Sequence, residues 1–96
     1  MKEKSVRFKN ATEFGKSLGL SEIEMELIRQ KKKLIEKLKA ARTKKKFSQA
    51  QLATLVGSKQ PAIARMESGL VSEVSLDFLA KIAIALDVSF TFKHAA

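Results

Sequence analysis

Cysteine is absent from the sequence, which excludes disulfide bonds and thiolate metal sites and gives no sign of an oxidising compartment. The 96 residues include only one proline and four glycines, and no low-complexity tract is present. With 45% apolar and 30% charged residues, this composition favours one folded, helix-rich core over a disordered chain or a repeat array. No apolar run approaches the length that spans a bilayer, so we expect a cytoplasmic protein without membrane contact.

Groups that carry out catalysis are also scarce. The one histidine, His94, lies in the C-terminal tail without a neighbouring acid or nucleophile, and the carboxylates are scattered along the chain. The sequence has no glycine-rich loop that would hold a phosphate and no cluster of metal ligands. We therefore expect no enzyme activity, no cofactor and no metal site.

What the sequence has in excess is positive charge. Lysine and arginine number 19 against 10 acidic residues, which gives a net charge of +9 at pH 7. Between positions 29 and 46 the one acid is Glu36, and the basic residues are Arg29, Lys31, Lys32, Lys33, Lys37, Lys39, Arg42, Lys44, Lys45 and Lys46. A solvated helix face and a polyanionic partner are equally compatible with this run, so the residues that follow it must decide.

Hydrophobic periodicity predicts the first part of the fold. Residues 1–20 are expected to form an extension with a short strand at 6–8 and a short helical segment that Gly19 ends. Ser21 and Glu24 form a capping-box pattern, and apolar residues then recur at helical spacing. A long helix is therefore expected over about 22–44, and its polar face carries the basic run.

Three shorter helices are expected downstream. Ser48 starts a second capping box, and Gly57 ends that helix after barely two turns. Ser58 is expected to cap the next helix, with Pro61 in its first turn, where the missing N–H breaks no intrahelical bond. Ser75 is expected to cap the last helix. The predicted core consists of Leu38, Phe47, Leu52, Ala53, Val56, Ile63, Met66, Leu79, Ile82, Ala83 and Leu86.

The C-terminal residues alternate between apolar and polar. Val88, Phe90 and Phe92 alternate with Ser89 and Thr91, which predicts a strand with one hydrophobic face. An isolated strand of this kind tends to pair across a two-fold axis, so we expect its three apolar residues to form a dimer contact. Pairing with residues 6–8 of the same chain and packing on the core are the alternatives.

Residues 48–69 have the pattern of two short helices joined by a turn of about three residues. Such a pair is typical of proteins that place the second helix in the major groove of DNA. The outward positions of that helix are Lys59, Gln60, Pro61, Ala62 and Arg65. Glutamine can pair with adenine, arginine with guanine and an alanine methyl with the thymine methyl, so these residue types suit base edges.

Several stretches in this region together carry a family resemblance. They are FSQAQLA at 47–53, VGS at 56–58, QPAIARMESG at 60–69, SLDFL at 75–79 and IAIAL at 82–86. In this spacing they resemble the Cro/repressor, or Xre, helix-turn-helix family over about residues 34–88. The resemblance implies an all-α, five-helix DNA-binding domain at 28–88, with a helical extension at 1–27 and a C-terminal strand or tail at 89–96.

The family resemblance also implies roles for single residues. Bases would meet Gln60, Pro61 or Ala62, and Arg65, while Gln49, Lys59 and Ser68 would lie at the phosphate backbone. Pro61 departs from the polar residue of many relatives, so specificity is expected to rest on Gln60 and Arg65. The alternatives are that Gln60 is merely exposed and that Arg65 forms an intramolecular ion pair. A structural ion pair is implied between Arg42 and Glu67, because a buried carboxylate is costly unless it is paired.

The expected partner is double-stranded DNA, with a homodimer on a palindromic operator. The stretch LGLSEIEMEL at 18–27 is similar to HigA-type antitoxins, which implies a RelE-like ribonuclease toxin as partner and repression of the chain's own operon. Glu22, Glu24 and Glu26 could meet a basic toxin, or simply favour the positive end of their own helix. A regulator without a toxin is the first alternative. A protein-interaction or membrane-surface module built on the basic helix is the second.

Overall fold

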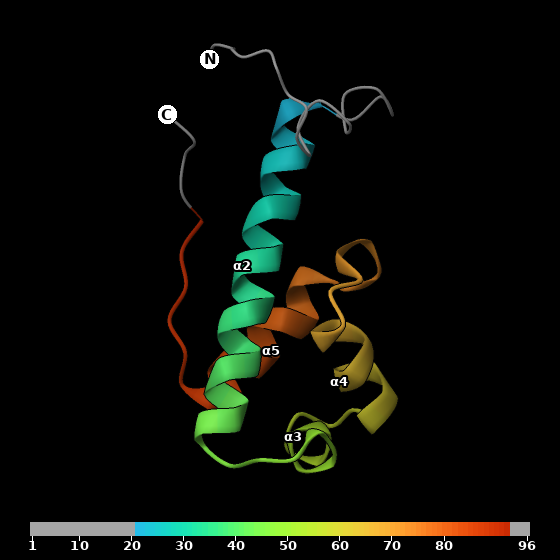
Figure 1. Cartoon of the computed structure of the whole chain (residues 1–96), viewed down its shortest axis with the longest axis vertical. Coiled ribbons are helices and arrows are strands. Elements are labelled where there is room, and N and C mark those ends of the chain that lie inside the picture. Colours follow the sequence, from blue (N-terminus) through green and yellow to red (C-terminus); the bar gives the residue numbers. More distant parts are fainter. Residues whose placement is uncertain (1–20, 93–96) are drawn as a thin grey trace.

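The computed structural model of the chain describes residues 21–92. They form α2 (Glu22–Lys44), α3 (Gln49–Leu55), α4 (Gln60–Glu67), the short 3-10 helix η1 (Val71–Glu73) and α5 (Leu76–Leu86) (Figure 1). No strand occurs among these residues, so the described part is all-α. The five α-helices predicted for the domain are not observed, because the described residues form four α-helices and the single 3-10 turn η1 between α4 and α5. The helix and strand predicted at 1–20 lie outside the described residues.

α2 is the long helix that the sequence predicts. The Ser21 hydroxyl accepts from the Glu24 N–H and the Glu24 carboxylate accepts from the Ser21 N–H, each at 3.0 Å. This capping box satisfies N–H groups that have no partner within the helix. The carboxyl half of α2 buries Leu34, Ile35 and Leu38 against the rest of the domain, while its amino half extends past α5 (Figure 1).

α3 and the turn that follows it also form as predicted. Ser48 caps α3 with a second capping box, in which Gln51 supplies the reciprocal side chain. Gly57 follows the helix with a φ of 70°, a left-handed conformation that glycine adopts without a steric penalty. The chain therefore reverses after two turns of helix and leads directly into α4.

The start of α4 differs from the prediction. Its N-cap is Lys59 rather than Ser58, and no side chain caps it. Ser58 instead donates its backbone N–H to the carbonyl of Ala53 at 2.8 Å, which holds it in the turn. Pro61 lies in the first turn as predicted, and its fixed φ suits a helix start without a side-chain cap.

The core lies where α2, α3, α4 and α5 meet. Its largest fully buried side chains are Leu38, Leu52, Ile63, Met66, Leu79, Ile82 and Leu86, all of which were predicted. Ala53 is also buried, and the predicted Phe47, Val56 and Ala83 pack half-buried against this cluster. Leu34, Ile35, Val71 and Val74 complete the core beyond the predicted set.

Residues 88–92 run alongside α2 without forming the predicted strand (Figure 1). Lys37 Nζ donates to the Ser89 carbonyl at 2.7 Å and lies 5.9 Å from the centre of the Phe90 ring. Val88 and Phe90 pack half-buried on the core, while Phe92 meets Phe90 edge to face and stays 51% exposed. The strand prediction is wrong for these residues. Packing on the core, one of the two alternatives to a dimer contact, holds for Val88 and Phe90 but leaves Phe92 half exposed. The other alternative involves residues 6–8, outside the described residues.

Candidate nucleic-acid interface

α3 and α4 pack against each other, and α4 lies at the surface of the domain (Figure 1). α4 buries Ile63 and Met66 completely, which fixes the face that it turns to the core. Gln60, Pro61 and Arg65 are exposed on its other side. The short helix therefore presents three of the four predicted base-facing residues to solvent, while Ala62, the fourth, is half-buried.

An ion pair joins α2 to α4. Arg42 Nε donates to Glu67 Oε2 at 2.6 Å and its Nη2 donates to Glu67 Oε1 at 3.0 Å, in a two-pronged arrangement. The third donor, Nη1, bonds to the carbonyl of Phe47 at 2.7 Å. The side chains are only 14% and 3% exposed, so this pair ties α2, the loop before α3 and the end of α4 into one unit.

The ion pair continues outward as a chain of amide hydrogen bonds. Gln49 Nε2 donates to Glu67 Oε1 at 3.0 Å, and Gln60 Nε2 donates to Gln49 Oε1 at 2.7 Å. We call Arg42, Glu67, Gln49 and Gln60 the Arg42–Gln60 network. It fixes the amide of Gln49 at both ends, and it leaves Gln60 with Oε1 and one N–H for a further partner. An acceptor and a donor side by side match adenine N6 and N7.

The electrostatics of the pair follow from its burial and its hydrogen bonds. Burial by itself would raise the pKa of Glu67, but hydrogen bonds from Arg42 and Gln49 and the charges of Arg42 and Lys39 lower the pKa overall. The hydrogen bond to Glu67 raises the pKa of Arg42. Both groups therefore stay charged at neutral pH, as the network requires.

The remaining predicted contact residues lie toward the two ends of α4. Lys59 is exposed at the amino end, and Ser68 is exposed just after the carboxyl end, where its hydroxyl donates to the Arg65 carbonyl at 2.7 Å. Arg65 is 53% exposed, and its Nε lies 4.0 Å from Oε1 of Glu73 in η1. A loose intramolecular ion pair, the alternative named for Arg65, is thus present beside an exposed guanidinium.

Two features of this surface were missed at the level of sequence. Gln49 was assigned to a phosphate contact, but it also bridges Glu67 and Gln60, which lie on another helix. Glu73 was given no role, although it is the acid nearest to Arg65 in the structure. Helical periodicity relates residues within one helix, so neither contact had a signal in the spacing of the sequence.

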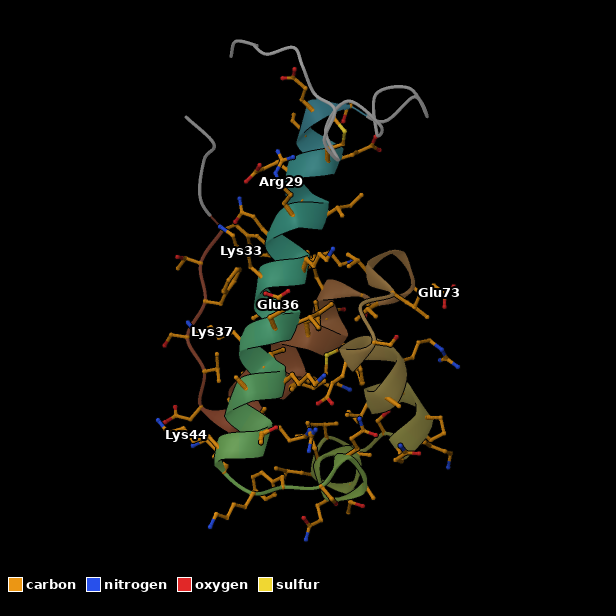
Figure 2. The ribbon with its side chains drawn as sticks, in the orientation of Figure 1. Arg29, Lys33, Glu36, Lys37, Lys44 and Glu73 are labelled. Carbon is orange, nitrogen blue, oxygen red and sulfur yellow. The ribbon has the colours of Figure 1, made fainter. Side chains whose placement is uncertain are left out.

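The basic run is only partly on this side of the molecule. In Figure 2 the labelled Lys33, Lys37 and Lys44 project from α2 toward the side of residues 88–92, away from α4. The hydrogen bond from Lys37 to Ser89 places that lysine there independently. Arg42, by contrast, faces α4 and is fully engaged with Glu67 and Phe47. These lysines of α2 therefore lie on a different side of the domain from the outer face of α4, and the positive charge is not concentrated on that face.

The comparison with known families agrees with this geometry. A family model described as helix-turn-helix matches residues 38–93, which is more than half of the chain. The chain belongs to the helix-turn-helix family. The match is of the Xre type and identifies a DNA-binding domain of transcription regulators, a kind of domain that is typically not enzymatic. No curated protein and no solved structure gave a match.

The described part of the helix-turn-helix domain shows neither a metal site nor a membrane-spanning helix. Among residues 21–92, no three acidic, histidine or cysteine side chains gather in the way that a metal ion requires. Over the same residues, no helix is both long enough and apolar enough to cross a bilayer. The surface of α4 and the end of α3 is therefore the site that the described residues support best.

Proposed function

We propose that this helix-turn-helix protein is a sequence-specific transcriptional repressor that binds double-stranded DNA with α4 in the major groove. The observation that carries the proposal is the Arg42–Gln60 network, which anchors an exposed glutamine amide to a buried ion pair. A side chain held in one orientation loses little conformational entropy when it binds a base. This is what a residue that reads sequence needs.

The contacts of the proposed complex follow from the exposed groups. Gln60 bonds adenine through its free acceptor and donor, and Arg65 bonds guanine O6 and N7. Pro61 and Ala62 offer only apolar contact, which suits a thymine methyl. Lys59 and the second N–H of Gln49 meet phosphate oxygens, which fixes the position of α4 in the groove. Ser68 joins them when its hydroxyl turns from the Arg65 carbonyl to a phosphate.

Selection from a pool of randomised duplexes tests this function. The wild-type protein should enrich one sequence and bind it about a thousandfold more tightly than random DNA. Gln60→Ala should lower that preference at one base pair by a factor of about 10, because it removes a two-pronged contact. Thr54→Ala serves as the matched control, because Thr54 is an exposed polar residue near the carboxyl end of α3, outside the proposed contact residues. Equal affinity for every duplex and for acidic vesicles would instead support the surface-module alternative.

A homodimer on a palindromic operator is part of the same proposal. One recognition helix covers few base pairs, and two copies related by a two-fold axis meet successive major grooves about 34 Å apart. Val88, Phe90 and Phe92 remain the proposed contact, and Phe92, at 51%, is the most exposed of the three. Ile84 of α5 is 81% exposed and lines one groove with Val88, Phe90 and Phe92, so it extends this surface.

We also propose that the amino half of α2 binds a partner protein, with the RelE-like toxin of a HigA-type pair as the candidate. Ile23, Leu27 and Ile28 support this, since they are 82%, 39% and 36% exposed on a helix that extends past the core. The acidic residues give less support than expected. Glu24 caps its own helix, and Glu26 is bound by Arg29 at 2.6 Å.

Neighbouring genes and co-purification test this second proposal. A RelE-like reading frame beside this gene should yield a product that co-purifies with the wild-type chain. Ile23→Asp should abolish that co-purification, while Leu70→Asp, an equally drastic change at an exposed leucine outside α2, should preserve it. Lack of such a reading frame would leave the regulator without a toxin as the function. Equal retention of the toxin by both variants would instead show that the toxin does not bind at Ile23.

A further inference from the structure

Glu73 stands beside the proposed guanine-reading residue. It is the last residue of η1, and its Oε1 lies 4.0 Å from Arg65 Nε, with the two side chains 60% and 53% exposed. In Figure 2 the label of Glu73 lies on the side of the molecule opposite to that of Lys37. Arg65 and Glu73 line one hollow, together with Ala62 of α4, Ser58 of the turn and Ser75 at the start of α5.

The atoms that meet in this contact determine what Arg65 can still bind. The carboxylate lies nearest to Nε, so the two terminal nitrogens of the guanidinium remain for another partner. A guanine edge accepts two parallel hydrogen bonds from such a fork. A phosphate accepts them equally well, but it would carry its negative charge toward that of Glu73, and like charges at this range repel.

We propose that Glu73 is a positioning residue that directs Arg65 to a base and away from the DNA backbone. This rests on the proposed function of Arg65 in reading guanine. An exposed arginine that faces DNA binds any phosphate within reach, which strengthens binding to all DNA and reduces discrimination. A carboxylate beside it weakens the phosphate contact and leaves the base contact, so Glu73 increases specificity while it lowers affinity for random DNA.

Glu73→Gln tests this role, because it keeps the size and polarity of the side chain and removes its charge. Affinity should be measured for a duplex selected by the wild-type protein, for the same duplex with the Arg65-dependent base pair changed, and for random DNA. We expect affinity for random DNA to rise about threefold, the scale of an exposed ion pair, and the preference at that base pair to fall about threefold. Glu36→Gln, an exposed carboxylate on α2, makes the same charge change away from Arg65 and should alter all duplexes alike.

The Arg65→Ala background separates the inference from the function on which it rests. There, Glu73→Gln should no longer change the base preference and should act only as Glu36→Gln does. If Glu73→Gln matches Glu36→Gln in the wild-type protein as well, or if its effect on preference persists without Arg65, the inference is wrong. If Arg65→Ala alone leaves every base preference intact, the proposed role of Arg65 fails first.

Discussion

The exposed side chains of α4 differ in how firmly they are held. Gln60 is bonded at 2.7 Å to Gln49, which is itself bonded to the buried pair of Arg42 and Glu67. Arg65 has only the 4.0 Å contact to Glu73. One proposed reader is therefore fixed before DNA arrives, while the other keeps the freedom to adjust to its base.

Arg65 and Lys59 should give opposite results on specificity. Arg65→Ala should lower affinity for the selected duplex by about 1 to 3 kcal/mol and relax one base pair, because it removes a base-edge contact. Lys59→Ala should weaken binding to all duplexes equally and reduce the slope of log affinity against log salt by about one, as expected for a lost phosphate contact. Titrations of both variants against selected and random duplexes at several salt concentrations measure the difference. Indistinguishable behaviour would contradict the assigned roles.

Glu67 should make the fold sensitive to acid. Its pKa is lowered in the folded state, so its contribution to stability is present above the ordinary glutamate pKa of about 4.3 and is lost as pH falls through the lowered value. Glu67→Gln should unfold about 3 kcal/mol more easily at neutral pH, because it leaves Arg42 buried without its charge partner. The loss relative to wild type should shrink as the pH falls below about 4.

Urea unfolding at neutral and acid pH measures this effect. Glu36→Gln is the control, because it removes a carboxylate from an exposed position on the same helix as Arg42. A Glu67→Gln variant as stable as Glu36→Gln at neutral pH would show that the pair contributes nothing to the fold.

At the scale of the helices, α3 and α4 depend on the core for their stability. They have only 7 and 8 residues, and helices this short are not stable alone in water. Leu52 of α3 and Ile63 of α4 are both 0% exposed, so each fixes its helix against the core. The orientation of the helix-turn-helix unit therefore comes from packing.

Truncation of these core residues should be costly. Ile63→Ala should lower the free energy of unfolding by about 2 to 5 kcal/mol through lost burial and the cavity that remains, whereas Ile63→Val should lower it by about 1 kcal/mol. Leu52→Ala should resemble Ile63→Ala. Thermal or urea unfolding monitored by circular dichroism measures all three. An Ile63→Ala variant that unfolds like the parent would place Ile63 outside the core.

The starts of the helices could be predicted from the sequence at three of the four serines that were expected to cap them. Ser21, Ser48 and Ser75 each cap the helix that was predicted to follow. The hydroxyl and the N–H group that it binds are only three residues apart, so this contact can be predicted from the local sequence. Ser58 has the same residue type but holds the turn through its backbone instead. Local chemistry thus predicts helix starts well, except where a neighbouring proline already provides the start.

Predictions failed where the outcome depended on distant residues. Alternation of apolar and polar residues at 88–92 suggested a strand, but the actual contacts come from the core and from Lys37, which lies 52 residues before Ser89. The bridge from Glu67 through Gln49 to Gln60 likewise joins two helices. The family resemblance predicted contact residues on α4, of which Gln60, Pro61 and Arg65 are exposed, but it did not provide the hydrogen bonds that orient them.

For the whole molecule, the charge of +9 at pH 7 and the proposed binding surface do not coincide. Lys33 projects toward the side of the C-terminal segment (Figure 2). Lys59, by contrast, is the N-cap of α4. Lys33→Ala should therefore leave the salt slope of DNA binding nearly unchanged, while Lys59→Ala reduces it by about one. A reduction of the slope by Lys33→Ala as large as that by Lys59→Ala would mean that the DNA also contacts α2.

Assembly should depend on the C-terminal segment. Phe92→Asp should weaken dimerisation about tenfold or more, because it places a charge where the proposed contact buries an aromatic ring. Leu70→Asp, which changes a comparably exposed leucine between α4 and η1, should leave the dimer intact. Sedimentation velocity across a range of concentrations measures both. If Phe92→Asp sediments as the wild type does and Ile84→Asp becomes monomeric, the two-fold contact lies on α5 alone.

Pro61 in the first turn of α4 affects how well the operator can be distinguished from other chromosomal sites, as well as how the helix starts. A ring without donors or acceptors cannot distinguish base pairs by hydrogen bonding and offers only apolar contact with a thymine methyl. The operator should therefore carry less information at the position that Pro61 faces than at those of Gln60 and Arg65. Each weakly specified position multiplies the number of chromosomal sites that compete for the protein. A repressor built this way needs either a second half-site, which the proposed homodimer would supply, or a high local concentration near its target, which the proposed repression of its own operon would supply.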